Sequence, residues 1–165
     1  MELNFKTARI EDLSFLAHVC REANYHYSKI MPGNYARLAE KFEKNGLPDN
    51  YSIYIMQTRN KNIGFLGFVP LNRKIMYLVG MFLLLDYQRQ GYGSLTLKKY
   101  LEKLQAGGYE EAILLAHKKA SWALDFYSKN RFTILSGNYE EIKNYGSGAM
   151  RAFALPAAYL MKRSL

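Results

Sequence analysis

Residues 75–85, with the sequence IMYLVGMFLLL, form a nearly continuous apolar run in the middle of the chain. A strand with one face in solvent alternates apolar and polar residues, whereas a strand covered on both faces is apolar throughout. The run is shorter than the roughly eighteen apolar residues that a membrane-spanning helix needs. It therefore predicts a central strand of a sheet that is covered on both faces.

The segments before this run predict a further three strands and two helices. Apolar and polar residues alternate where strands are expected, at residues 3–8, 51–55 and 63–69, and the polar turn 59–62 joins the last two into a hairpin. Apolar residues recur at helical spacing in residues 10–19 and 35–44. The Tyr- and His-rich segment 24–34 is expected to connect these two helices.

The segments after the run predict alternating helices and strands. Helices are expected from Ser94 to the glycines at 107–108 and at 121–129, and strands at 112–116, 132–135 and 149–155. A loop is expected at 137–148 and a C-terminal tail at 156–165. A length of 165 residues fits one domain. We therefore expect a single mixed α/β domain over residues 1–165.

The charge balance indicates an anionic partner. The chain has 23 Lys and Arg against 14 Asp and Glu, a formal net charge of +9, which would attract nucleic acid or a phosphorylated cofactor. The basic residues are spread along the chain instead of forming one run interleaved with aromatic residues. Nucleic acid is therefore the less favoured partner.

Other features of the composition predict a cytoplasmic protein without a metal. Polar residues interrupt the start of the sequence, which argues against a signal peptide, and no segment predicts a membrane partner. The single cysteine, Cys20, fits a reducing compartment and is expected in the core. No Cys and His cluster has the spacing of a metal site.

The segment QRQGYG, from Gln88 to Gly93, lies between the apolar run and an amphipathic helix. The N-terminus of a helix leaves backbone N–H groups without partners and carries partial positive charge, so a tight turn there suits a phosphate. Gly91 and Gly93 allow positive φ and a close approach of the anion. The alternative is a plain glycine loop that caps the helix.

The segment resembles the acetyl-CoA motif Q/R-x-x-G-x-G/A of the GCN5-related N-acetyltransferase (GNAT) superfamily. The resemblance extends from LNFKTARIEDLSFL to GAMRAFALP and is nearest to the ribosomal-protein N-terminal acetyltransferase type. It implies an acyl-CoA N-acyltransferase fold with mostly antiparallel N-terminal strands and a splayed central pair. It also implies acetyl-CoA as cosubstrate.

The resemblance implies which residues hold the cofactor. Backbone amides of the glycine segment would bind the pyrophosphate, and the preceding strand would pair with the pantetheine arm. The residues concerned are Gln88, Arg89, Gln90, Gly91, Tyr92, Gly93 and Ser94 in the segment and Met81, Phe82 and Leu83 in the strand.

A second family pattern, N-x-x-A-x-x-x-Y followed by Gly-Phe, is partly present. Ala123, Tyr127 and Phe132 match it, whereas Ala120 replaces the Asn and Arg131 replaces the Gly. Loss of the Asn would remove one hydrogen bond to the pantetheine arm, about 1 kcal/mol or roughly fivefold in affinity. Arg131 would lengthen the helix or bring its charge to a cofactor phosphate.

The resemblance makes Tyr127 the candidate general acid that protonates the leaving thiolate, and a backbone N–H near Phe82 or Leu83 would meet the oxyanion. The alternative for Tyr127 is a core tyrosine packed by its aromatic neighbours. The family's basic Glu corresponds to Leu115, so the base is missing. Strand alternation places His117 on the same face, as a candidate base or a partly exposed strand-end histidine.

The acceptor residues are aromatic. The resemblance places Tyr25, His26 and Tyr27 between the first two helices, where the acceptor pocket forms, and places Tyr139 in the same region. Tyr77 is a candidate for positioning a water molecule. Aromatic walls suit a cationic or flat acceptor, although such residues can equally cover apolar surface.

The leading hypothesis is therefore direct acetyl transfer from acetyl-CoA to a primary amine of a small molecule or peptide. The alternative is a GNAT-fold protein that binds acyl-CoA or nucleic acid without catalysis, because the family Asn and Glu are missing. The resemblance also implies a homodimer that pairs through sheet edges, with the apolar residues 156–160 in the contact.

Overall fold

The computed structural model describes residues 2–165, which form two compact units. The N-terminal unit comprises the residues up to Phe68 together with Gly80–Thr96, and the C-terminal unit comprises Val69–Val79 and Leu97–Leu165. Strand β4 (Ile75–Leu83) and helix α3 (Tyr92–Ala106) contribute residues to both units. Each unit is described by itself below.

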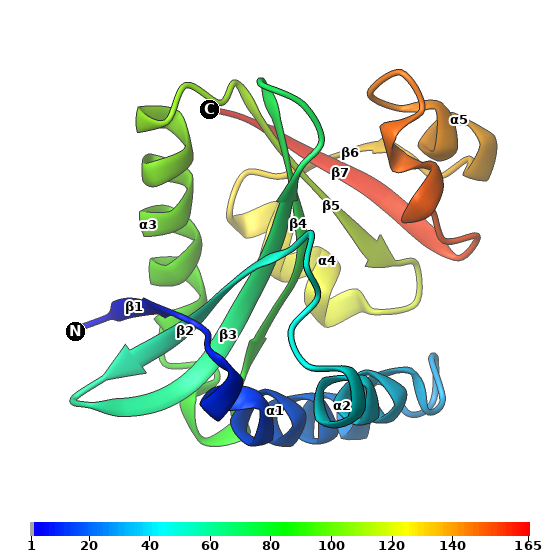
Figure 1. Cartoon of the computed structure of the whole chain (residues 1–165). Helices are drawn as coiled ribbons and strands as arrows, with labels where there is room; N and C mark the ends of the chain where they lie inside the picture. The colour runs from blue at the N-terminus through cyan, green and yellow to red at the C-terminus, as the bar shows by residue number, and fades with distance from the viewer. Residues whose placement is uncertain (1) are drawn as a thin grey trace. The chain divides into compact units, whose positions relative to one another are not determined.

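The N-terminal unit combines an antiparallel sheet with two helices. Strand β1 (Asn4–Thr7) pairs with β2 (Ser52–Thr58), and β2 pairs with β3 (Lys61–Pro70), both antiparallel. After a 3₁₀ turn, η1 (Ile10–Asp12), helices α1 (Leu13–Tyr27) and α2 (Asn34–Asn45) lie side by side (Figure 1). Their apolar faces bury a core with β2 and β3 that includes Leu16, Cys20, Phe42, Ile55 and Phe65.

Helix α1 is longer than the sequence pattern predicts. Residues 24–27, expected in a connection, form its last turn, so Tyr25, His26 and Tyr27 are helical. The first strong helix breakers come only at Pro32 and Gly33, and Gly33 has a φ of +75° directly before α2.

The C-terminal unit contains the first part of β4 and the strands β5, β6 and β7. The first half of β4 pairs parallel with β5 (Glu111–His117), which pairs antiparallel with β7 (Ala158–Ser164), and β7 pairs antiparallel with β6 (Thr133–Ser136). Helix α4 (Ser121–Lys129), helix α5 (Tyr139–Asn144) and the 3₁₀ turn η3 (Ala149–Ala152) complete it. A core cluster of this unit includes Tyr77, Ile113, Ile142, Met150 and Leu160.

The prediction of a last strand at 149–155 is wrong. Residues 149–152 form η3, and the last strand is β7, within the segment expected to be a tail. Pro156 separates the two segments and has no N–H for a sheet. β7 pairs with β5 over residues 158–164 and with β6 only at residues 160–162.

The loop expected at 137–148 contains helix α5. The side chain of Asn138 accepts hydrogen bonds from the N–H groups of Glu140 and Glu141, which caps the helix. The acidic residues of this first turn also favour the positive end of the helix dipole. A short helix is hard to recognise because it has barely two turns of apolar spacing.

The predicted mixed α/β class and splayed central pair are confirmed. The ladder between β4 and β5 joins only residues 75–78 to 111–114, although both strands continue beyond it. The N-terminal strands β1 to β3 are antiparallel, as expected. The apolar run thus forms a strand over 75–83, two residues shorter than its sequence.

Helix α4 ends in a Schellman motif that holds Arg131 in the left-handed region. The N–H of Arg131 donates to the carbonyl of Ser128 and that of Phe132 to the carbonyl of Tyr127, both at 3.0 Å. The Arg131 φ is +66°. The helix ends at Lys129, so Arg131 does not lengthen it, contrary to expectation. The position needs the conformation that a glycine adopts without strain.

We predict that Arg131→Gly stabilises the protein. A non-glycine residue in the left-handed region costs about 1–2 kcal/mol, partly offset by the greater freedom of glycine in the unfolded chain. The expected gain of about 0.5–1 kcal/mol raises the Tm by roughly 2 °C, measured by thermal unfolding. Arg131→Ala is the control, since it removes the charge but keeps Cβ. An equal gain from both variants would assign the effect to charge instead.

Candidate active site

The glycine segment forms a tight turn between β4 and α3. A 3₁₀ turn, η2 (Leu85–Tyr87), follows β4, and the N–H of Gln88 donates to the carbonyl of Leu85 at 3.1 Å. Arg89 and Gly91 then have φ values of +55° and +87°. The first bond of α3 runs from the Leu95 N–H to the Gly91 carbonyl, at 3.0 Å.

This geometry presents backbone donors at the start of a helix. Within residues 2–165, the N–H groups of Gln90, Gly91, Tyr92 and Gly93 have no backbone acceptor. Gln90 and Gly91 are exposed, and Tyr92 and Gly93 are half-buried. The turn therefore combines free amides with the positive end of the helix dipole, as an anion site requires.

The two glutamine side chains of the turn bind the protein's own backbone. Gln88 Nε2 donates to the Leu83 carbonyl at 2.9 Å, and Gln90 Nε2 donates to the Asp86 carbonyl at 2.5 Å. Both amides therefore brace the turn. Of the two residues, Gln90 offers an anion its main-chain N–H, whereas the Gln88 N–H already donates to the Leu85 carbonyl.

Residues 81–83, the predicted pantetheine strand, lie at the end of β4 beside an aromatic cluster. The Phe82 ring contacts Phe65 and Tyr35, with centroids 5.2 and 5.1 Å apart, and Tyr35 contacts Tyr27 at 4.8 Å. The cluster thus places Tyr27 in a ring series that reaches β4. Sequence reasoning missed Tyr35, which carries no motif and joins the two.

The other two acceptor candidates of α1 lie outside this cluster. Tyr25 is 77% exposed, and the only ring contact found for it among the described residues is an edge contact with His26 at 6.2 Å. His26 is also exposed. These two side chains are therefore available to solvent, whereas Tyr27 is half-buried.

Tyr127, the candidate acid, lies on the last turn of α4 and is half-buried. Its ring contacts Phe126 and Phe132, with centroids 5.2 and 5.8 Å apart. The contact with Phe132 is the apolar contact that usually accompanies a Schellman motif. The motif thus fixes both the backbone and the ring of Tyr127.

His117, the candidate base, ends β5 and is half-buried. Burial and, secondly, the charge of Lys119 lower its pKa below the usual value, so the ring is neutral at pH 7. The Lys119 N–H donates to His117 Nδ1 at 3.1 Å. The neutral ring therefore carries its proton on Nε2, and its basic nitrogen is already hydrogen-bonded.

Two of the three departures from the family pattern, Leu115 and Ala120, also lie in apolar surroundings. Leu115 packs against the core cluster of the C-terminal unit, and Ala120 is fully buried at the N-cap of α4. Ala120 provides no side-chain cap. Neither position therefore contributes a polar group.

Tyr77 and Tyr139 lie in different surroundings. Tyr77 is 5% exposed, in the core cluster, with its ring 4.9 Å from that of Phe153. Tyr139 is exposed on α5, with Lys143 Nζ 5.2 Å from its ring centroid. Tyr77 therefore offers little surface to an acceptor or a water molecule.

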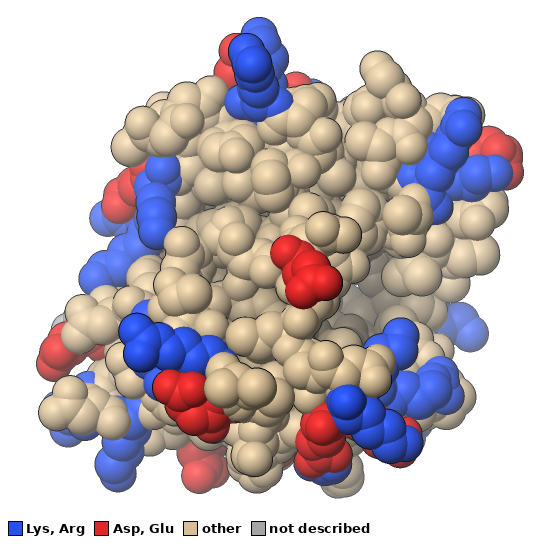
Figure 2. All heavy atoms as spheres, in the orientation of Figure 1, with Lys and Arg blue, Asp and Glu red and all other residues tan. Residues whose placement is uncertain are grey.

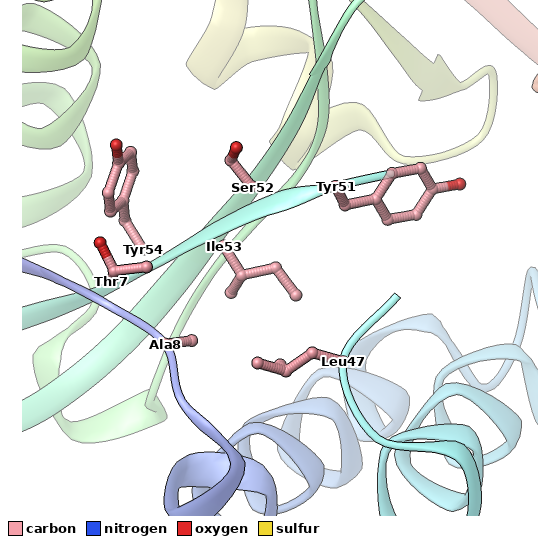
Figure 3. A pocket seen from close by; sticks show the side chains of 7 residues that line it. All are labelled: Thr7, Ala8, Leu47, Tyr51, Ser52, Ile53 and Tyr54. Atoms are coloured by element: carbon pink, nitrogen blue, oxygen red, sulfur yellow. The ribbon is translucent and has the colours of Figure 1, made fainter. Parts of the chain in front are cut away.

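A cavity of about 160 Å³ lies in the N-terminal unit, away from every predicted site residue. It is lined by Thr7, Ala8, Leu47, Tyr51, Ser52, Ile53 and Tyr54. Figure 3 shows Leu47 and Ile53 pointing toward each other, while Ser52 and Tyr54 point to the opposite side of the strand. No charged side chain lines this cavity.

The surface shows no gathering of basic side chains on the face in Figure 2, where Lys and Arg are interspersed with Asp and Glu.

No helix within residues 2–165 has the length and apolar composition needed to cross a bilayer. In the same described part of the chain, no three His, Cys, Asp or Glu side chains are grouped as ligands of a metal ion.

Comparison with known proteins identifies the family. The model of the acetyltransferase (GNAT) family matches residues 16–132, and no curated protein sequence matches the chain. Among solved structures, PaiA N-acetyltransferase from Thermoplasma acidophilum in complex with coenzyme A has a TM-score of 0.71 at 17% identity, over 100% of both chains.

Two further solved structures share the fold. Ard1 from Thermoplasma volcanium has a TM-score of 0.67 at 16% identity, over 100% of this chain and 99% of its own. Spermidine N-acetyltransferase from Vibrio cholerae, in complex with CoA and spermine, has a TM-score of 0.68 at 13% identity, over 98% and 95%. Because the family model spans well over half of the chain, the protein belongs to the GNAT family of acetyltransferases, whose cosubstrate is acetyl-CoA.

Proposed function

We propose that the protein transfers the acetyl group of acetyl-CoA directly to a primary amine of a small molecule or peptide. The observation that carries the proposal is the glycine turn at the start of α3, with its unpaired amides and its two positive φ values. Acetyl-CoA supplies an acetyl carbon activated as a thioester. The roles below are assigned to the chain's own residues.

The turn would bind the pyrophosphate of the cosubstrate. The N–H groups of residues 90–93 would donate to phosphate oxygens, and the dipole of α3 would favour the negative charge. Residues 81–83 would hydrogen-bond the pantetheine arm as an added strand. The aromatic contacts of Phe82 support this role, because they hold its side chain and leave the main chain as the binding group.

Tyr127 would donate its hydroxyl proton to the departing thiolate, and an N–H near Phe82 or Leu83 would stabilise the oxyanion. His117, neutral at pH 7, would accept a proton from the amine at Nδ1 once the Lys119 N–H leaves that atom. Leu115 has no carboxylate, and the carboxylate of Glu111 on the same strand already accepts hydrogen bonds from Tyr145 and Lys162, which leaves His117 as the candidate base on β5.

The acceptor would be an amine, in keeping with the spermidine N-acetyltransferase among the structural neighbours. Tyr27 and Tyr35 would form an aromatic wall, and the exposed Tyr25 and His26 would line its approach. Aromatic faces attract cations, so a polyamine or a peptide α-amine suits them. Tyr139, which is exposed, is also proposed to contact the acceptor. The buried Tyr77 would contribute only through the small surface that it exposes.

We predict that Gly91→Trp weakens acetyl-CoA binding at least tenfold in calorimetry, because a side chain would fill the space that the phosphate needs. Gly108→Trp is the matched control. Gly108 also has a positive φ, +84°, and no atom within 4 Å of an added Cβ. The Kd of acetyl-CoA for Gly108→Trp should therefore lie within about twofold of the wild-type value. Equal affinities for all three proteins would refute the turn as the site.

We predict that Tyr127→Phe lowers kcat by about 10²-fold, the lower range for loss of a general acid. The Kd of acetyl-CoA should stay the same, since the ring still packs on Phe132. Tyr109→Phe, a half-buried tyrosine without an assigned role, should keep full activity. Unchanged turnover of Tyr127→Phe at neutral pH would mean that another group supplies the proton.

We predict that His117→Gln lowers kcat/KM for the amine at least tenfold and leaves the Kd of acetyl-CoA unchanged. Gln can keep a hydrogen bond to the Lys119 N–H but cannot accept a proton. Steady-state kinetics with a panel of amines and peptides, read as free-thiol release, measures this. The same assay tests the rival hypothesis, because a non-catalytic acyl-CoA binder would release no thiol with any acceptor.

A further inference from the structure

The segment that leads into the glycine turn is held by two other elements of the N-terminal unit. The N–H of Leu84 donates to the carbonyl of Ile63 on β3 at 2.9 Å. The N–H of Leu85 donates to Oε2 of Glu22 on α1 at 2.8 Å. Glu22 lies 63 residues earlier in the chain, so this second bond joins a helix to the start of the turn.

Glu22 caps the start of η2, because its side chain accepts the hydrogen bond of the first N–H of that turn. Leu85 is the first residue of η2, and the preceding residue, Leu84, has no side chain that could cap it. A carboxylate that accepts from a backbone N–H makes a charge-assisted bond, which is stronger than a neutral one. Nε2 of His18, one turn earlier on α1, lies 3.3 Å from Oε1 of Glu22 and orients the carboxylate from its other side.

We propose that Glu22 is a positioning residue for acetyl-CoA: its carboxylate fixes Leu85, and through η2 the orientation of the amides in the glycine turn. This inference rests on the proposed function, in which that turn binds the pyrophosphate. Helix α1 also carries Tyr27, whose ring series reaches Phe82. Glu22 therefore holds the helix with the acceptor candidates and the cofactor turn in one fixed arrangement.

The chain offers a matched control on the same helix. Arg21 on α1 pairs with Glu43 on α2 at 2.7 Å, which is an ion pair between the two helices with no contact to the turn. Glu43→Ala therefore removes a glutamate that binds α1 without touching the segment from Leu84 to Gly93. Glu22→Gln keeps an oxygen that can accept from Leu85, whereas Glu22→Ala does not.

The test is calorimetry with acetyl-CoA on the wild type and the three variants, together with steady-state kinetics. Glu22→Ala should raise the Kd and the KM of acetyl-CoA about tenfold, with kcat at saturation unchanged. Glu22→Gln should stay within about threefold and Glu43→Ala within about twofold of the wild type. Equal losses in Glu22→Ala and Glu43→Ala would overturn the inference, because they would indicate a general effect on α1.

Hydrogen exchange of the ligand-free proteins gives a second readout. Glu22→Ala should lose protection at the Leu85 amide and keep it at Ile55 on β2, which shows that the fold is intact. Lost protection with an unchanged Kd would overturn the inference while the proposed function stands. If Gly91→Trp also binds as tightly as the wild type, the proposed site itself fails, and the inference fails with it.

Discussion

The close approach of β3 to the end of β4 fixes the path of the chain into the candidate cofactor site. A Cβ added at Gly64 would lie 2.1 Å from the Phe82 carbonyl oxygen and 2.9 Å from the Leu83 Cα, both main-chain atoms that cannot rotate away. Only glycine permits this spacing. The adjacent bond from Leu84 to Ile63 then sets where β4 ends, and η2 and the glycine turn start from that point.

The local part of this arrangement could be predicted from the sequence. An apolar run, a glycine turn and an amphipathic helix each have a short-range signature, and β4 and α3 were placed within two residues at the ends that flank the turn. The last strand could not be predicted in this way. Residues 149–155 and 158–164 are both largely apolar, and pairing with β5 and β6 selects the second.

In the candidate site, too, some residues have a local sequence signal and others are placed by contacts between distant segments. Tyr127 belongs to a spacing pattern that the sequence shows, whereas Tyr35 and Glu22 make their contacts with distant segments and have no local signal. For Tyr77, the sequence indicates the position on the strand but not the burial. Its position on the central strand suggested a role with water, but the packing of Phe153 buries it.

The departures from the family pattern fall into two kinds with different physical meaning. At Arg131 the side chain changed but the left-handed backbone remained, held by the Schellman bonds and the contact of Tyr127 with Phe132. These interactions outweigh the strain of the arginine, so the geometry around Tyr127 is retained at some expense in stability. At Leu115, which is partly buried, and at Ala120, which is fully buried, the family's polar groups are replaced by apolar ones. Under the proposed function, the chain would keep the parts that hold the cofactor turn and the phenol, and amine deprotonation would fall to His117 or to water.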